Sequence, residues 1–171
     1  TVSPLGETNR FEFDGRHNLL RSIDPLNFTN RLFYDSQYRL TSTVDARGNT
    51  NRFGYNTQHS LVGQTNAAGD WIAFGYNTDG TLAGRTNAGG ATTFGYDANG
   101  QLNRTTYPGG LGGEGFLNNS FGDVLSHTNA RGFVTSFQYS MRRELTNTIA
   151  PTNITARVVY DAVGNVQSTT D

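Results

Sequence analysis

The chain has 171 residues, and its 13 basic and 14 acidic residues give a formal net charge of −1. All the basic residues are arginine and both signs are scattered along the chain, which argues against electrostatic capture of nucleic acid or of an anionic membrane. Cysteine is absent, so a disulfide framework and a thiolate metal site are excluded. No apolar run approaches the roughly 18 residues that indicate a transmembrane helix.

A nine-residue stretch organises the chain, because Phe-Gly-Tyr-Asn-Thr-Asp-Gly-Thr-Leu at 74–82 returns as Phe-Gly-Tyr-Asp-Ala-Asn-Gly-Gln-Leu at 94–102. The residue at its third place recurs every 20 to 22 residues and defines a ladder. Such a period predicts stacked repeats instead of one folded core. In chain order the ladder residues are Phe13, Tyr34, Tyr55, Tyr76, Tyr96, Asn118, Tyr139 and Tyr160, of which only Asn118 has no aromatic ring.

Two further slots of each repeat are always apolar. The Phe slot lies two places before the ladder residue and holds Phe11, Leu32, Phe53, Phe74, Phe94, Phe116, Phe137 and Val158. The Leu slot lies six places after it and holds Leu19, Leu40, Leu61, Leu82, Leu102, Val124, Leu145 and Val166. A spacing of two places side chains on one face of a strand, so the pattern predicts a strand ending at each ladder residue and a second strand carrying the Leu slot.

Turn residues separate these strands. Asp or Asn can bond its own downstream backbone, and glycine accepts a positive φ. Each unit of about 21 residues therefore reads as strand, turn, strand, turn. One such hairpin buries too little apolar surface to stand alone, so we expect the ladder to form a continuous core between neighbouring hairpins. The predicted turn glycines are Gly48, Gly69, Gly80, Gly100, Gly122, Gly132 and Gly164.

Two stretches depart from the pattern. Residues 107–115 replace a short turn with a glycine-rich loop directly before the repeat that carries Asn118, and we expect a bulge or kink there. Residues 149–153 contain Pro151, which suits a turn or a sheet edge. We otherwise expect residues 1–171 to form a single repeat array, a fragment of a longer repeat region.

Three histidines and a glycine-rich stretch resemble parts of catalytic or cofactor-binding motifs. His17 and His59 occupy a turn glycine slot and His127 lies on a predicted strand, so turn-forming or surface roles are favoured over catalysis. The glycines of residues 110–115 match a dinucleotide-binding pattern, but a strand pattern follows them where that motif needs a helix.

The regularly spaced carboxylates raise a further alternative, because repeated aspartates can bind calcium. Most equivalent slots hold Asn or Ser, so turn formation is favoured. No catalytic, cofactor or metal site is expected. The aromatic ladder could instead be an exposed platform for stacking sugars, although a packing role is preferred. The carboxylates concerned are Asp24, Asp45, Asp70, Asp97 and Asp161.

The pattern F-x-Y-D-x-x-G-x-L followed by a D/N-x-x-G turn resembles the YD-repeat, or Rhs-repeat, family. The match is strongest at residues 94–102 and 158–166, and the literal Tyr-Asp pair stands at Tyr34-Asp35, Tyr96-Asp97 and Tyr160-Asp161. The resemblance implies an all-β array of hairpins that forms a continuous spiralling sheet, the wall of a hollow shell, as in Rhs proteins, the shell subunits of Tc toxins and teneurins.

The resemblance also implies a function. It points to a non-enzymatic structural section of a secreted or cell-surface protein whose shell encloses or delivers a toxin or other cargo. The alternative is an open extracellular fibre or adhesin that contacts cells or carbohydrate. The expected partners are further YD repeats, in the same polypeptide or in neighbouring copies. Because unpaired strand edges pair readily with other chains, we expect the isolated segment to self-associate.

Overall fold

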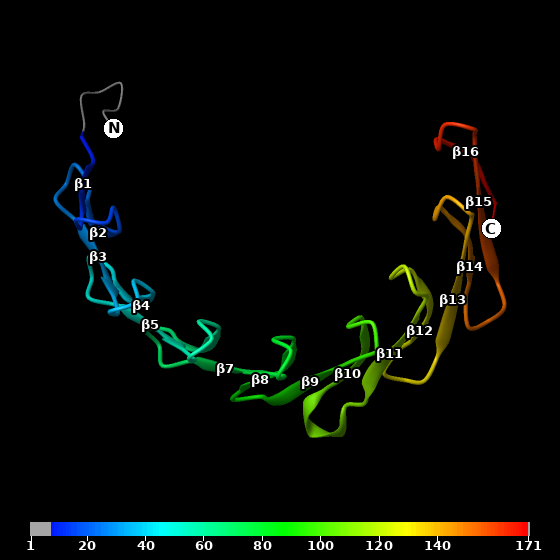
Figure 1. Ribbon diagram of the computed structural model, residues 1–171, viewed down its shortest axis with the longest axis horizontal. Helices are drawn as coiled ribbons and strands as arrows, with labels where there is room; N and C mark the ends of the chain where they lie inside the picture. The colour runs from blue at the N-terminus through cyan, green and yellow to red at the C-terminus, as the bar shows by residue number, and fades with distance from the viewer. Residues whose placement is uncertain (1–7, 171) are drawn as a thin grey trace. The chain divides into compact units, whose positions relative to one another are not determined.

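Residues 8–170 are described by a computed structural model, in which they form sixteen β-strands and one short 3-10 turn, with no α-helix in that range (Figure 1). The all-β array of hairpins predicted from the repeat is therefore confirmed. No helix within residues 8–170 has the length and apolarity to cross a membrane.

The chain divides into two compact units, Thr1–Gly75 with Thr86–Ala88 and Tyr76–Arg85 with Gly89–Asp171. The first holds β1 (Arg10–Phe13), β2 (Leu19–Ile23), β3 (Thr29–Tyr34), β4 (Leu40–Val44), β5 (Thr50–Tyr55), β6 (Leu61–Thr65) and most of β7 (Trp71–Tyr76). Strand β8 (Leu82–Asn87) spans the division. The second holds β9 (Gly90–Tyr96), β10 (Leu102–Thr106), β11 (Gly113–Asn118), β12 (Val124–Thr128), β13 (Val134–Tyr139), β14 (Leu145–Ile149), β15 (Thr155–Tyr160) and β16 (Val166–Thr170).

Strand boundaries follow the repeat slots. Strand β3 ends at the ladder residue Tyr34, and β4 begins at the Leu-slot residue Leu40. The same boundaries recur through both units, as the sequence predicted. Within each unit every strand pairs antiparallel with the strand next to it in the chain, for example β3 with β4 and β4 with β5. Short turns and period-two alternation thus build the array from local connections.

A register shift accompanies the ladder residues. Phe33 of β3 pairs with Ser42, whereas the next residue, Tyr34, pairs with Leu40, so Thr41 of β4 is passed over. Because cross-strand partners share a face of the sheet, this bulge returns Leu40 to the face of Tyr34. Equivalent shifts occur in hairpins of both units.

The glycine-rich junction is irregular in a different way from the expected bulge. Strands β10 and β11 pair there through Thr105 with Glu114 and Thr106 with Gly113, without a shift. The irregularity lies in the loop, where the 3-10 turn η1 (Pro108–Gly110) reverses the chain. Positive φ angles at Gly109, Gly110 and Gly112 absorb the reversal, so the strand hydrogen bonds stay in register.

The ladder is only half covered. No apolar side chain among residues 8–170 is fully buried, and the aromatic ladder and Phe-slot side chains are half-buried except at the first hairpin. There Phe11 and Phe13 are 47% and 56% exposed. Within each unit the strands form one layer, so a side chain is covered only by neighbours on its own face. This differs from the continuous core that the sequence predicted.

Candidate functional site

The ladder tyrosines form hydrogen bonds between neighbouring hairpins. In the first unit the Tyr34 hydroxyl donates to the Leu19 carbonyl oxygen at 3.0 Å, and Tyr55 donates to Leu40 at 3.0 Å. In the second unit the same bond joins Tyr96 to Leu82, Tyr139 to Val124 and Tyr160 to Leu145 at 2.9 to 3.0 Å. Each acceptor is the Leu-slot residue of the preceding hairpin. Each tyrosine side chain therefore supplies a half-buried ring and a specific hydrogen bond to the preceding repeat.

Asn118 retains this bond although it lacks the ring. Its side-chain Nδ2 donates to the Leu102 carbonyl oxygen at 2.9 Å, the position that a tyrosine hydroxyl takes in other hairpins. The sequence pattern showed only that Asn118 stands where the other repeats have an aromatic ring. The amide could have been recognised as a donor of suitable type, but its reach depends on the spacing between two hairpins.

Asp and Asn cap the turns after the strands. The Asp35 Oδ1 accepts from the backbone N–H groups of Gln37 and Arg39 at 2.8 and 3.0 Å, while the Tyr38 N–H donates to the Asp35 carbonyl. Asn129 makes the equivalent bonds to Arg131 and Phe133. These are the turn bonds that the residue types predicted.

The carboxylates considered for calcium are placed in such turns. Asp24, Asp45, Asp97 and Asp161 each accept two backbone N–H groups through Oδ1, and Asp70 Oδ2 accepts from Asn66 Nδ2. Among residues 8–170 no three acidic or histidine side chains converge on one point. Bonds from Asn49 lower the pKa of Asp45, and bonds from Asn165 lower the pKa of Asp161.

The predicted turn glycines all adopt positive φ, between 76° and 92°. Other hairpins place a residue with a side chain at the same slot, and His17, His59 and Arg143 have φ of 68°, 66° and 66°. A left-handed residue that is not glycine carries a conformational cost. The first two histidines are thus turn residues, whereas Arg143 gains contacts that the glycines lack.

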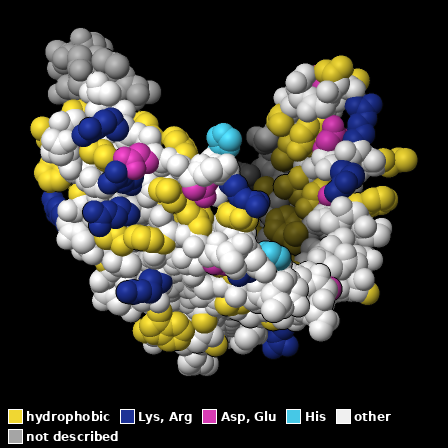
Figure 2. Space-filling view, turned by 60° about the vertical axis from the view of Figure 1, so that its left-hand side comes forward, with side chains coloured by type: hydrophobic (Ala, Val, Ile, Leu, Met, Phe, Trp, Pro, Cys, Tyr) yellow, Lys and Arg dark blue, Asp and Glu magenta, His cyan; other side chains and the backbone are white. Residues whose placement is uncertain are grey.

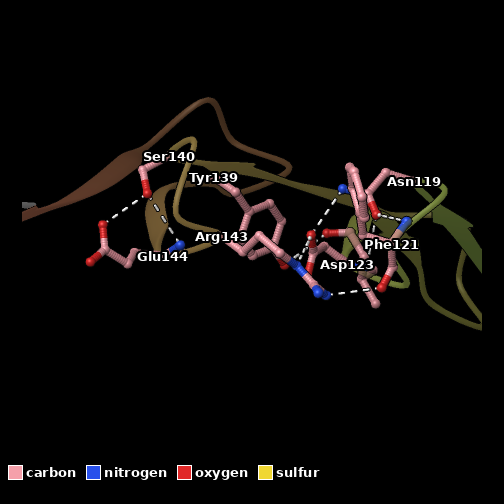
Figure 3. Close-up of polar contacts among 8 residues, drawn as sticks. Asn119, Phe121, Asp123, Tyr139, Ser140, Arg143 and Glu144 are labelled. Atoms are coloured by element: carbon pink, nitrogen blue, oxygen red, sulfur yellow. Dashed lines mark hydrogen bonds and ion pairs between the residues drawn. The ribbon is translucent and has the colours of Figure 1, made fainter. Parts of the chain in front are cut away.

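Two arginine side chains, Arg39 and Arg143, connect turns that follow ladder residues in neighbouring hairpins. Figure 3 shows Arg143 reaching from its own turn to the turn that follows Asn118. Its Nη2 donates to Asp123 Oδ1 at 2.7 Å and to the Phe121 carbonyl at 2.9 Å, and its guanidinium lies 5.6 Å from the Phe121 ring centroid. The Arg143 bond, followed by that from Asn119, lowers the pKa of Asp123.

An arginine plays the same part in the first unit. Arg39 Nε donates to Asp35 Oδ2 at 2.7 Å, and its Nη1 donates at 2.9 Å to the carbonyl oxygen of Asn56, in the turn that follows the next ladder residue. Its guanidinium also lies 4.9 Å from the ring centroid of Tyr55. Charge-assisted bonds of this kind orient both turns at once.

A polar cluster of Tyr107, Glu114 and His127 lies beside the glycine-rich junction between β10 and β11. Tyr107 Oη donates to Glu114 Oε1 at 2.9 Å, and the other carboxylate oxygen lies 3.3 Å from His127 Nε2. The His127 ring stacks on Phe116 with centroids 4.9 Å apart. The Glu114 bond raises the pKa of the Tyr107 phenol. Sequence reasoning missed this cluster, because it depends on the pairing of Phe116 with His127 and on how the loop closes.

Two glycines of the junction are required by close packing. A methyl group at Gly113 would lie 2.2 Å from the Thr105 carbonyl oxygen, and one at Gly112 would lie 2.8 Å from that of Ala130. Strand β11 starts at Gly113, so the dinucleotide-like glycine pattern leads into a strand, as the sequence predicted. These glycines permit backbone approach instead of forming a phosphate loop at a helix.

The site as a whole links repeats. The tyrosine hydroxyls and the Arg39 and Arg143 guanidinium groups bond to a neighbouring hairpin, whereas the turn carboxylates other than Asp123 bond within their own turns. We expect the bonds between hairpins to stabilise stacking and register. The stabilising role of the ladder itself stays a prediction, which the variants below test.

Comparisons with known proteins agree with this geometry. The model of the RHS Repeat matches residues 76–111, which include two ladder tyrosines. A comparison with curated proteins gave no match.

Solved structures share the fold. The Tc holotoxin pore of Photorhabdus luminescens superimposes with a TM-score of 0.71 at 12% identity over 91% of this chain and 10% of its own. The crystal structure of TcdB2-TccC3 without its hypervariable C-terminal region gives a TM-score of 0.59 at 16% identity over 94% of this chain and 11% of its own. This chain therefore spans about a tenth of those relatives. The RHS Repeat model thus matches one part of the chain, and these solved structures share the fold of nearly all of it.

Proposed function

We propose that this chain is a non-enzymatic section of a shell wall in a secreted or cell-surface protein, and that the shell encloses or delivers a toxin or other cargo domain. The observation that carries the proposal is the likeness of nearly the whole chain to a section of Tc toxin structures. The bonds between hairpins support it, because a wall needs repeats that hold one another in register without a second layer.

The edges of the array supply the second part of the proposal. All residues of β1 and β16 are exposed, and each strand has one edge on which it pairs with no other strand among residues 8–170. Unpaired strand edges pair with other strands. Further YD repeats, in the same polypeptide or in another copy, are the proposed partners.

Electron microscopy of the complete protein tests the shell. A closed hollow particle with internal density, together with protection of the enclosed domain from protease, is the expected result. An open fibre with a protease-accessible cargo domain would contradict enclosure and favour the adhesin alternative.

Sedimentation velocity of the isolated 171-residue segment tests the edges. The proportion of associated species should rise with concentration. A single monomeric species at every concentration would show that the edges do not pair.

A further inference from the structure

The charged side chains of the strands in the first unit gather on the face opposite the ladder. Strand pairing sets Glu12 against Arg21, and Arg21 directly against Arg31. The face continues from β3 through Ser42 to Arg52, since these two residues pair across β4 and β5. We call this surface the arginine face; its cations are Arg10, Arg21, Arg31 and Arg52.

Stability of the unit does not account for this arrangement. Like charges placed directly opposite on two strands are unfavourable, and Arg21 faces Arg31 in that way. Among the described strands of the first unit, only β1 brings a carboxylate to this face, that of Glu12, which pairs with Arg21. The guanidinium groups of Arg31 and Arg52 have no hydrogen-bond or ion-pair partner among residues 8–170, although the backbone of both residues is paired in the sheet. In Figure 2 dark blue arginine side chains follow one another down the left-hand flank, where the first unit is turned forward.

A shallow depression adjoins the arginine face at β5 to β7. Trp71, 45% exposed, pairs with Thr65, which in turn pairs with Arg52. Beside them the cross-strand row Gly54, Gly63 and Ala73 forms a floor without long side chains, and the depression has a volume of about 340 Å³.

Packing within the sheet does not require glycine at these floor positions. A methyl group at Gly54 would meet no atom closer than 4.0 Å, and one at Gly63 none closer than 3.8 Å. Glycine inside a strand weakens it and often marks a place where a ligand approaches the backbone. A flat ring can therefore lie over this floor against the exposed indole.

We propose that the arginine face binds a carboxylated polysaccharide, with one sugar ring stacked on Trp71 and carboxylates of the following sugars held by Arg52 and Arg31. Guanidinium groups pair with carboxylates through two parallel hydrogen bonds. The indole supplies a broad apolar surface for the ring at low entropic cost. This binding does not depend on the proposed shell, because it uses one face of one unit.

A sugar polymer fits better than nucleic acid for two reasons. The hydroxyl side chains of Ser42 and Thr65 stand beside Arg52 in the cross-strand row and can bond sugar hydroxyls. The strands of the first unit bring two exposed aromatic rings to this face, Phe33 on β3 and Trp71 on β7, and these strands are not neighbours, whereas a nucleic-acid single strand needs platforms for successive bases.

The chain's single tryptophan makes the test direct, since its emission reports on Trp71 alone. Titration with polygalacturonate should change that emission saturably, and added NaCl should weaken the binding. The double variant Arg31→Gln/Arg52→Gln should bind about tenfold more weakly. Arg104→Gln, an exposed strand arginine of the second unit, serves as the matched control and should bind like the unaltered chain.

Circular dichroism first establishes that each variant keeps its β spectrum. The proposal fails if polygalacturonate gives no saturable change, or if the double variant binds as tightly as the unaltered chain. It also fails if neutral dextran or an oligo-deoxythymidine binds as tightly as polygalacturonate, since the face would then recognise sugar rings without charge, or polyanions in general.

Discussion

The hairpin of β13 and β14 and the hairpin of β11 and β12, which follows the glycine-rich junction, bond to the preceding hairpin in different ways. In the first, Tyr139 brings a ring and a hydroxyl bond to the preceding hairpin, and the strands turn through short capped loops. In the second, Asn118 keeps the bond without the ring, and a glycine-rich loop with a 3-10 turn replaces the short turn.

This difference distinguishes the hydrogen bond between hairpins from the apolar coverage by the ring, which a single tyrosine supplies together elsewhere in the ladder. Inter-hairpin register is preserved wherever a donor reaches the Leu-slot carbonyl, whether it is a phenol or an amide. Apolar coverage varies independently, and at the junction the Phe116–His127 stack and the Glu114 bonds stand near the missing ring. We therefore expect register to depend on the polar bond and the aromatic surface to add stability.

Removing the side chain of the ladder residue Tyr139 should have the largest effect on stability. Tyr139→Ala removes a half-buried ring and its bond, and should lower the free energy of unfolding by about 3 kcal/mol. Asn118→Ala removes only the bond and should cost about 1 kcal/mol. Urea denaturation of both variants measures the two losses. Equal losses would show that the ring contributes nothing beyond its hydroxyl.

A methyl group at the junction should be nearly as damaging. Gly113→Ala forces the backbone away from the Thr105 carbonyl and should cost about 2 kcal/mol. Gly54→Ala is the control, because its methyl group has free space, and its effect should stay within about 0.5 kcal/mol. Thermal unfolding followed by circular dichroism compares them. A tolerated Gly113→Ala would mean that the junction loop is not held as the structure shows.

Restoring the missing ring should have a smaller, opposite effect. Asn118→Tyr extends the aromatic ladder and lets a hydroxyl take over the bond to Leu102, which should stabilise by about 1 kcal/mol. Urea midpoints of the variant and the unaltered chain give the difference. Destabilisation would indicate that the polar cluster at the junction occupies the space of the ring.

Arg143 and His59 occupy the same turn position, with a left-handed backbone, but we expect glycine to affect stability differently at each. Arg143→Gly relieves a left-handed backbone but removes the bonds to Asp123 and Phe121, and we expect a lower melting temperature. His59→Gly relieves the same strain without losing such bonds and should change stability by no more than about 1 kcal/mol. If both variants behave alike in thermal unfolding, the arginine does not join the turns.

The smallest effect is the pH dependence of a single turn. The bonds from Asn165 depress the pKa of Asp161 in the folded state below the value near 3.9 of an unfolded chain. The contribution is therefore present above about pH 4 and is lost as pH falls through the folded pKa. Asp161→Asn should reduce the fall in melting temperature between neutral and acidic pH, because Asn66 caps its turn without titrating. An unchanged pH profile would contradict this.

The repeat pattern by itself determined the secondary structure closely. Strands ending at Tyr34 or Tyr139 and turns with left-handed Gly48 or Gly164 follow from alternation and turn chemistry, which act over a few residues. Likewise, the Asp and Asn caps are local bonds between a side chain and the backbone two and four residues later. Such features need no knowledge of the neighbouring hairpin.

Only the tertiary structure decided how the hairpins meet. Three contacts depend on inter-strand register and on a bulge that period-two alternation does not reveal. They are the bond from Tyr139 to Val124, the bond from Asn118 to Leu102 and the stacking of His127 on Phe116. The half-exposure of the ladder and the arginine face arise for the same reason. A single-layer sheet leaves both faces uncovered, and pairing between strands places residues distant in sequence side by side.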